Sequence, residues 1–421
     1  MTYVQALQCR ECGRRVDVAA THACGFCFGP LEVVYDYDAM RGVVTRERIA
    51  AGPPTLWRYA DLLPVLDGPN NQQDARGASR VDLGAGFTPL VPAPRLGQAI
   101  GLDDLWLKND TLNPTGAFKD RVVSVALTAA RSLGFDTAAC ASTGNLAQSV
   151  AAHAAASGMR AVVLVPSDLE QAKILATAVY GPTLVAVKGN YDDVNRLCGE
   201  LADAYGWAFV NVNVRPFYAE GSKTIGFEIA EQLGWRLPDH VVAPMASGAM
   251  LVKIAKAFRE LVDLELVEDR PCRVSGAQAS GCSPITAAYK DGGDTIRPVR
   301  PDTIAKSLAI GDPADGYYAL EAVAASGGAM EDVSDAEIID GIKLLASTEG
   351  VFGETAAGVT IAVLRKLVAQ GRIARGDRTV AVISGNGLKT TDAIAPTVGP
   401  TFEISPNLDD FRTALSLQES V

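Results

Sequence analysis

The chain alternates short apolar runs with longer stretches that repeat at helical spacing. A short run that is apolar without alternation is expected of a strand buried on both faces of a sheet. Such runs predict strands at residues 161–165, 184–187, 208–212, 241–243 and 380–383.

Between these runs, apolar residues recur every three or four positions, which predicts amphipathic helices. One stripe runs from Val122 to Leu133, and another runs from Leu146 to Ala154 with Gly158 as its predicted stop. The resulting βαβα order predicts an α/β fold with parallel sheets and helices on both faces. Because ligands of such sheets bind beyond the carboxyl ends of the strands, loops that directly follow a strand are the candidates for a site.

Composition narrows the class of protein. The 421 residues are 48% hydrophobic and 21% charged, which is a globular balance, and the length predicts two or three domains. No apolar run approaches the roughly 18 residues of a membrane-spanning helix, and the first residues lack a signal-peptide stretch, so we expect a cytoplasmic protein. The net charge of -11 argues against a broad surface for nucleic acid or an anionic membrane, although a small anionic substrate needs only a few positive groups.

The first 50 residues differ from the rest because they carry two CxxC pairs, formed by Cys9, Cys12, Cys24 and Cys27. Two such pairs separated by 11 residues can place four thiolates around Zn²⁺, as in a zinc ribbon. The alternative is a degenerate ribbon with reduced thiols. After this segment, the polar, turn-rich residues 66–80 predict a loop or linker.

Lys119 is the first candidate for chemistry. It lies in the segment LNPTGAFKDR, residues 112–121, where Pro and Gly predict a turn that leads into a helix. The positive end of a helix dipole disfavours a protonated lysine, and a lysine with a lowered pKa suits Schiff-base chemistry. By spacing alone, a surface lysine at a helix start is the simpler interpretation of Lys119.

Three further loops follow predicted strands and are rich in small or hydroxyl-bearing residues. They are ASTGN at 141–145, PMASGAM at 244–250 and SGNGLK at 384–389. Backbone N–H groups at such strand-to-helix loops can bind a carboxylate or phosphate. Taken singly, each could also be an ordinary helix cap or tight turn. The second loop is not a GxxxxGK[ST] loop, so a nucleoside triphosphate is not indicated.

In this order, the four motifs resemble the pattern of fold-type-II pyridoxal phosphate (PLP) enzymes related to tryptophan synthase β, and NPTGAFKDR resembles the threonine synthase family in particular. The segment GAGFTPL at 84–90 is similar to one that precedes them in that family. The resemblance covers about residues 84 to 394 and implies two parallel-sheet lobes, a homodimer and an N-terminal zinc-ribbon-like segment. The implied domains are 1–50 for that segment, 51–117 with 221–394 for a large PLP-binding lobe, 118–220 for a smaller mobile lobe, and 395–421 for a tail.

The resemblance also implies roles for single residues. Lys119 would form the Schiff base with PLP and later act as a general base. The other implied cofactor-binding residues are Phe118 beside the ring, Asn145 at its phenolic oxygen, Ala246, Ser247, Gly248 and Ala249 around the phosphate, Ser384 at the pyridine nitrogen, and Glu354 near the ring. The expected substrate-binding residues are Ser142 and Thr143 for the carboxylate, and Thr88, Arg121, Asn190 and Lys223 for a phosphate.

The expected reaction is the conversion of O-phospho-L-homoserine and water to L-threonine and phosphate. A neutral hydroxyl at Ser384 makes the cofactor ring a weaker electron sink, which favours elimination and replacement over transamination. Departures from the family pattern at Val122, Thr355 and the sparsely glycine-containing loop at 245–249 leave the substrate open. The alternatives are a β-replacement or β-elimination enzyme, such as cysteate synthase or a threonine or serine ammonia-lyase, and a non-enzymatic binding protein, against which Lys119 argues.

Overall fold

The computed structural model describes residues 2–66, 80–142, 144–167, 169, 171–188 and 191–419. Most of the linker predicted at 66–80 lies outside these residues, as do Thr143 and Asn190, two of the predicted substrate-binding residues. The chain divides into two compact units, Met1–Lys389 and Thr390–Val421. Among the described residues, no helix combines the length and hydropathy needed to cross a membrane.

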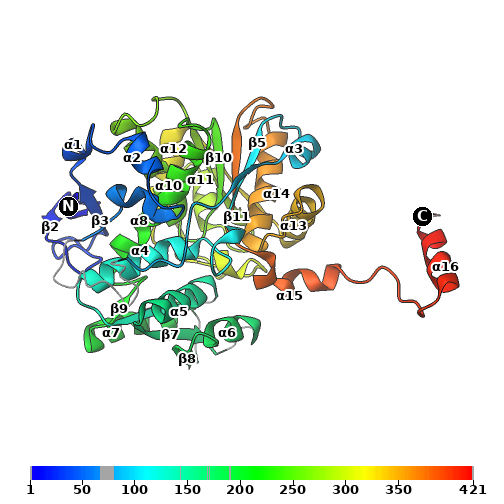
Figure 1. The fold of residues 1–421 in the computed structure, drawn as a ribbon, viewed down its shortest axis with the longest axis horizontal. Coiled ribbons are helices and arrows are strands. Elements are labelled where there is room, and N and C mark those ends of the chain that lie inside the picture. Colours follow the sequence, from blue (N-terminus) through cyan, green and yellow to red (C-terminus); the bar gives the residue numbers. More distant parts are fainter. Residues whose placement is uncertain are drawn as a thin grey trace. The chain divides into compact units, whose positions relative to one another are not determined.

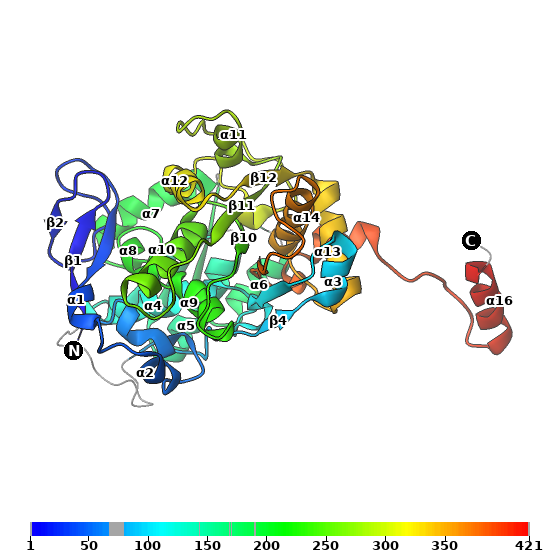
Figure 2. The ribbon, with the colours of Figure 1, turned by 90° about the horizontal axis from the view of Figure 1, so that it is seen from above.

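The larger of two parallel sheets in the first unit has six strands in the order β12-β11-β10-β13-β5-β4 (Figure 1). All neighbours are parallel except β4, which pairs antiparallel with β5 at one edge. Helices α10 and α14 lie on opposite sides of this sheet (Figure 2). The strands are β4 (Leu90–Pro92), β5 (Leu105–Asn109), β10 (His240–Pro244), β11 (Arg273–Ala279), β12 (Met330–Val333) and β13 (Thr379–Ile383).

The smaller parallel sheet has four strands in the order β8-β7-β6-β9. They are β6 (Thr137–Ala141), β7 (Arg160–Pro166), β8 (Thr183–Val187) and β9 (Ala208–Phe209). The two sheets confirm the predicted α/β class, but the strand expected over 208–212 is shorter. The chain turns after Phe209, because the Asn213 side chain accepts the Phe209 N–H at 2.8 Å and the Val212 N–H returns to the Phe209 carbonyl.

The helices follow the predicted apolar stripes. Gly158 ends α5 in a left-handed conformation (φ 71°), which a glycine adopts without strain. The helices of the first unit are α1 (Tyr37–Met40), α2 (Arg46–Ala50), α3 (Pro94–Ile100), α4 (Lys119–Ser132), α5 (Asn145–Ser157), α6 (Gln171–Ala178), α7 (Tyr191–Tyr205), α8 (Arg215–Glu220), α9 (Lys223–Gln232), α10 (Ala249–Asp263), α11 (Pro284–Lys290), α12 (Gly316–Ser326), α13 (Asp335–Glu349) and α14 (Thr355–Ala369).

The N-terminal residues form a small antiparallel sheet in the order β2-β1-β3, with β1 (Val4–Cys9), β2 (Arg15–Val16) and β3 (Leu31–Tyr35). One face of it is apolar and buried. Leu7 and Val33 belong to the same hydrophobic cluster as the helices that cover the large sheet. This segment is therefore packed into the first unit rather than held apart from it.

The second unit consists of α15 (Thr391–Ile394), a 3₁₀ turn at Ala395–Thr397 and α16 (Leu408–Glu419).

A network of buried charges fixes the first turn of α4 within the core. The Arg121 guanidinium binds Asp110 at 2.7 Å and also pairs with Glu228, whose other oxygen lies 2.6 Å from Lys108 Nζ. All four side chains have no exposed surface. Buried charges are tolerated only when paired and hydrogen-bonded, so each member of this network depends on the others.

We expect Glu228→Gln to lower the free energy of unfolding by about 3–5 kcal/mol, because it leaves the buried charges of Arg121 and Lys108 poorly compensated. Denaturant titration measures the change. The matched control is Asp103→Asn, which breaks the exposed pair with Arg375 and should cost less than about 1 kcal/mol. Equal effects of the two substitutions would contradict the importance of the buried network.

Candidate active site

The turn before α4 is shaped by Asp120, which places Lys119 at the start of the helix. The Asp120 carboxylate accepts hydrogen bonds from the backbone N–H and the hydroxyl of Thr115, both at 2.7 Å, and from the Ser149 hydroxyl of α5, also at 2.7 Å. Gly116 has a φ of 72°, in the region where glycine is preferred. The sequence prediction of a turn leading into a helix at Lys119 is confirmed.

This turn lies against the carboxyl end of β13. Ala117 forms an isolated bridge with Gly385, and the Phe118 N–H donates to the Ser384 carbonyl at 2.8 Å. The Glu354 N–H, at the start of α14, donates to the Gly385 carbonyl at 2.8 Å. Three segments far apart in the sequence therefore meet at one strand end, where parallel sheets place their ligands.

Three residues predicted to surround the cofactor ring converge here. The Ser384 hydroxyl donates to one oxygen of Glu354 at 3.1 Å, and the Asn145 amide donates to the other at 2.8 Å. Glu354 and Ser384 are buried. The group thus brings a carboxylate, a hydroxyl and an amide around one point, and these polar groups are suited to the polar edge of an aromatic ring.

Lys119 lies beside this group. Its Nζ donates to the Tyr218 hydroxyl at 2.7 Å and lies 4.6 Å from the centroid of the Phe118 ring. Burial lowers the pKa of Lys119 to about 8, although the Glu354 carboxylate opposes the shift. The predicted direction agrees with this shift, whose largest cause is burial.

Tyr218 was not among the residues predicted from the sequence. It lies on the short helix α8, and burial raises the pKa of its phenol, so the hydroxyl stays protonated at neutral pH. A carbon bonded to Lys119 Nζ would lie within about 4 Å of the phenol oxygen, given ordinary bond lengths. The segment RPFYAE carries no motif that indicates this contact, which arises only when α8 packs against α4.

The loop after β10 has the features of an anion-binding turn. The N–H groups of Ala246, Ser247 and Gly248 have no acceptor among the described residues, and they lead into the 15-residue helix α10. Gly248 has a φ of 94°, and a Cβ there would lie 2.9 Å from the Asp315 carbonyl oxygen. Free N–H groups at a helix start suit a phosphate. Three of the four predicted residues, Ala246 to Gly248, offer such groups, whereas the Ala249 N–H donates to the Ser247 hydroxyl at 3.4 Å.

The Ser142 hydroxyl is engaged with the start of α5, because its oxygen accepts from the N–H groups of Gly144 and Ala147 at 3.1 and 3.0 Å. Three other predicted substrate-binding residues, Thr88, Arg121 and Lys223, lie in closed networks.

Each donor of the Arg121 guanidinium is used within the buried network, which also engages the Thr88 hydroxyl. Lys223 Nζ, with no exposed surface, binds Glu220 at 2.7 Å, Glu260 at 2.9 Å and the Leu62 carbonyl at 2.8 Å. This geometry does not support the expectation that these side chains bind a substrate phosphate, because a charged group that is already saturated gains little from a further anion.

The four N-terminal cysteines come together as the sequence spacing predicts. Their Sγ atoms all lie within 4.8 Å of one another, with Cys9 and Cys27 3.4 Å apart and Cys12 and Cys24 3.8 Å apart. These two Sγ–Sγ distances are close to the distance between two sulfur ligands in a tetrahedral site whose Zn–S bonds are about 2.3 Å long. The donor set therefore fits a structural Zn²⁺ and leaves no open ligand position.

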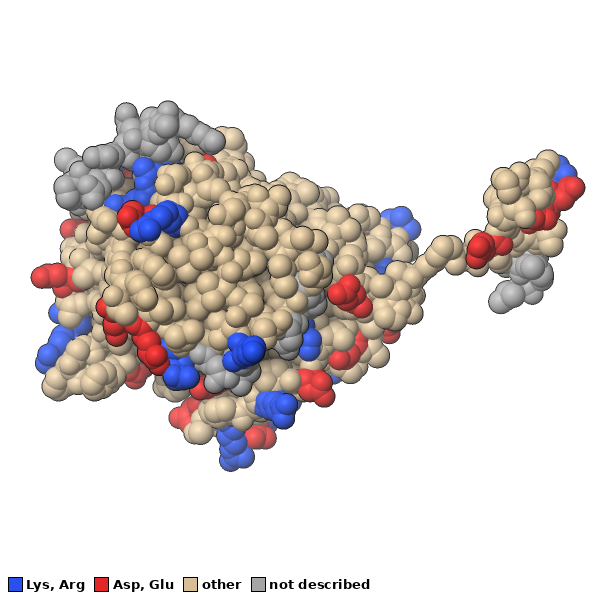
Figure 3. Space-filling model, turned by 90° about the horizontal axis from the view of Figure 1, so that it is seen from below, with Lys and Arg blue, Asp and Glu red and all other residues tan. Residues whose placement is uncertain are grey.

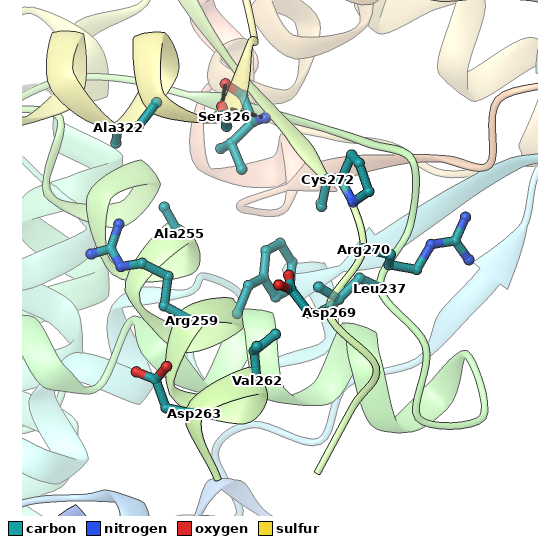
Figure 4. A pocket seen from close by; sticks show the side chains of 14 residues that line it. Leu237, Ala255, Arg259, Val262, Asp263, Asp269, Arg270, Cys272, Ala322 and Ser326 are labelled. Atoms are coloured by element: carbon teal, nitrogen blue, oxygen red, sulfur yellow. Dashed lines mark hydrogen bonds between the residues drawn. The ribbon is translucent and has the colours of Figure 1, made fainter. Parts of the chain in front are cut away.

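A separate cavity of about 570 Å³ lies between α10, α12 and the amino end of β11 (Figure 4). It contains none of the predicted site residues, and Arg259, Asp263 and Cys272 are among those that line it. Because Lys119 lies near the carboxyl end of β13, this cavity is not part of the candidate active site.

On the face shown in Figure 3, Lys and Arg are interspersed with Asp and Glu.

We expect Glu354→Gln to move the pKa of Lys119 below about 8, because the carboxylate favours the charged amine and its loss removes that stabilisation. The pH dependence of trinitrobenzenesulfonate labelling, followed at the Lys119 peptide by mass spectrometry, measures this in cofactor-free protein. Asp340→Asn, an exposed carboxylate on α13, is the control. An unchanged or higher pKa in the Glu354 variant would exclude the proposed electrostatic coupling.

The comparisons with known proteins agree with this geometry. Residues 81–385 match the family described as pyridoxal-phosphate dependent enzyme, and residues 8–32, which include the four cysteines, match a family described as NinF protein. Among solved structures, diaminopropionate ammonia lyase of Escherichia coli has a TM-score of 0.63 at 18% identity and covers 79% of this chain and 94% of that one. Threonine deaminase isoform 2 of Solanum lycopersicum has a TM-score of 0.61 at 20% identity, covering 79% and 84%. These structures establish the shared fold alone.

Curated relatives are more similar in sequence. Threonine synthase of Methanocaldococcus jannaschii is 38% identical over 388 residues, 92% of this chain and 93% of the relative. Threonine synthase of Methanosarcina acetivorans is 36% identical over 412 residues, 97% and 98% of the two chains. Since the similarity spans nearly the whole length and includes the Lys119 site, the chain belongs to the threonine synthase family of pyridoxal-phosphate dependent enzymes.

Proposed function

We propose that the protein converts O-phospho-L-homoserine and water to L-threonine and phosphate, with PLP held at Lys119. The observation that carries this proposal is the Lys119 amine, whose pKa is lowered to about 8 beside the convergent side chains of Glu354, Asn145 and Ser384. A large neutral fraction of this amine near pH 8 suits both attachment of a carbonyl cofactor and removal of a proton from carbon.

The residues around Lys119 support distinct tasks. When bound, PLP supplies an electron sink for negative charge that develops on the substrate. Asn145 and Ser384 would orient the ring, and the free N–H groups at residues 246–248 would hold its phosphate. Lys119 would take the proton from the substrate α-carbon and return protons later. Ser384, being uncharged, would favour elimination and replacement.

Arg121 and Lys223 are already paired with buried carboxylates, so we look for another cation to bind the substrate phosphate. Lys389 is a cation near the Lys119 turn. Its Cε would lie 3.3 Å from a Cβ built at Gly116, and its amine donates to Gln148 of α5. We propose Lys389 as the candidate that replaces them.

Incubation of the purified holoenzyme with O-phospho-L-homoserine should release phosphate and threonine in equal amounts, measured together by a phosphate assay and amino-acid chromatography. Lys119→Ala should lower kcat by at least about 10³-fold, because it removes both the cofactor linkage and the general base. Ser132→Ala on the same helix, whose hydroxyl donates to the Thr128 carbonyl, is a control with intact chemistry.

The products distinguish the alternatives. If phosphate is not released from O-phospho-L-homoserine but the protein holds PLP, then the proposed substrate is wrong. The next substrates to test are O-phospho-L-serine, L-serine and L-threonine, which would identify a β-replacement or β-elimination enzyme.

We also propose that Cys9, Cys12, Cys24 and Cys27 bind a structural Zn²⁺. The support is their mutual proximity and the two similar turns that present them. The Gly13 N–H donates to the Cys9 carbonyl at 3.1 Å, and the Phe28 N–H donates to the Cys24 carbonyl at 3.0 Å.

Elemental analysis should find about one Zn²⁺ per chain in protein purified without chelators. Removal of the metal, or Cys12→Ser, should lower the melting temperature, because metal-binding free energy contributes to folding. Cys272→Ser lies outside the cluster and serves as the control. Stable protein with four free thiols and no metal would support the alternative of a degenerate ribbon.

The remaining expectations stay predictions. We propose that residues 118–220, which carry the four-stranded sheet, form a smaller lobe that moves against the large lobe formed by 51–117 and 221–394. The homodimer and the cytoplasmic location rest on the family resemblance and the composition.

A further inference from the structure

Two of the contacts between the N-terminal segment and the body of the protein lead towards Lys119. The first contact joins β3 to α8 through buried charges. The Tyr35 hydroxyl donates to Glu220 at 2.9 Å, at the last residue of α8. Glu220 also binds Lys223 and Lys253 at 2.7 and 2.6 Å, and these ammonium groups hold the pKa of Glu220 well below its usual range against the opposing effect of burial.

This buried cluster extends back into the N-terminal sheet. Glu32 of β3 accepts from Lys253 at 2.9 Å and from Lys256 at 3.1 Å. Because Lys253 bridges Glu32 and Glu220, β3 and the end of α8 are held by the same ammonium group. Tyr218, which contacts Lys119, is only two residues from Glu220 on α8. Displacement of the α8 end would therefore move the Tyr218 hydroxyl relative to Lys119.

The second contact joins the first cysteine pair to the loop at 246–249. Between Cys9 and Cys12, Arg10 stacks over the Tyr318 ring at 3.3 Å and Glu11 accepts from the Tyr318 hydroxyl. Tyr318 lies in the first turn of α12.

Asp315, at the start of α12, connects this helix to the site. Its backbone N–H donates to the Ser247 carbonyl at 3.1 Å, and its own carbonyl leaves no room for a Cβ at Gly248. Its carboxylate accepts from Arg215, the first residue of α8. Both ends of α8 and the predicted phosphate loop are thus connected to the N-terminal segment.

We propose that the N-terminal cysteine segment is a positioning element of the active site: through Tyr35 and Glu220 it sets the distance between Tyr218 and Lys119, and through Glu11 and Tyr318 it holds the phosphate loop. Tyr35 and Tyr318 are positioning residues, since neither touches the reacting atoms. This inference rests on the role proposed for Lys119 but not on the identity of the substrate.

The test compares Tyr35→Phe, Tyr318→Phe and Tyr218→Phe in the holoenzyme. Tyr35→Phe retains the ring and removes only the hydroxyl that binds Glu220. Tyr317→Phe, on the neighbouring and exposed residue of α12, is the matched control. Three measurements are made. The pH midpoint of the absorbance of the bound cofactor and the Kd for added PLP need no substrate, and kcat and KM are measured with O-phospho-L-homoserine.

We expect Tyr218→Phe to shift the absorbance midpoint, and Tyr35→Phe to shift it in the same direction by a smaller amount. Tyr35→Phe, which removes the hydrogen bond to Glu220, should lower kcat by about fivefold. Tyr318→Phe should weaken PLP binding by a similar factor, measured as a higher Kd for added PLP, while Tyr317→Phe matches the wild type.

Wild-type values of the midpoint, kcat and the Kd for PLP in both Tyr35→Phe and Tyr318→Phe would overturn the proposal and leave the segment a purely structural addition. If Tyr318→Phe does not fold, Glu11→Ala tests the same contact from an exposed side chain. If the holoenzyme does not act on O-phospho-L-homoserine, the absorbance midpoint and the Kd for PLP still decide the inference, so its failure is distinct from failure of the proposed reaction.

Discussion

The pairing of Arg121 with Asp110 and Glu228 is the interaction on which the rest of the site depends. Arg121 lies two residues after Lys119, and its guanidinium has no exposed surface. Because an unpaired charge in this position would be strongly destabilising, the end of β5, the helix α9 and the first turn of α4 are held together. Asp120 acts in the same turn by fixing Thr115 and α5. The position of Lys119 is thus fixed by the two buried charged residues that follow it, Asp120 and Arg121.

This arrangement resolves a conflict in the requirements of the site. Lys119 needs a lowered pKa, which burial supplies, but a buried amine without partners would be costly. Tyr218 accepts a hydrogen bond from the amine, and Glu354 partly offsets the loss of water. The two partners lie on α8 and at the start of α14, so the pKa depends on elements that are distant in sequence. The N-terminal segment contacts the same helix through Glu220, the last residue of α8.

The acidic surplus of the chain is compatible with a site for anionic groups. The predicted phosphate loop relies on backbone N–H groups and a helix start, which need no cationic side chain. Several lysines and arginines are instead used inside the protein, where Lys108, Lys223, Lys253 and Arg121 neutralise buried carboxylates. Net charge therefore describes the surface of this protein and not the chemistry of its interior.

The sequence by itself determined the α/β class, the helix start at Lys119, the loops after the strands and the grouping of the four cysteines. These features follow from local rules: apolar periodicity, turn-forming Pro and Gly, and paired CxxC spacing. Only the tertiary structure decided that Arg121 and Lys223 are enclosed in ion networks and that Tyr218 reaches Lys119. Their partners, among them Asp110, Glu228 and Glu260, come from other elements, and no local pattern indicates which charges will be buried together. The sequence shows that a side chain can bind an anion, but the packing of helices decides whether that anion is a substrate or a carboxylate of the protein itself.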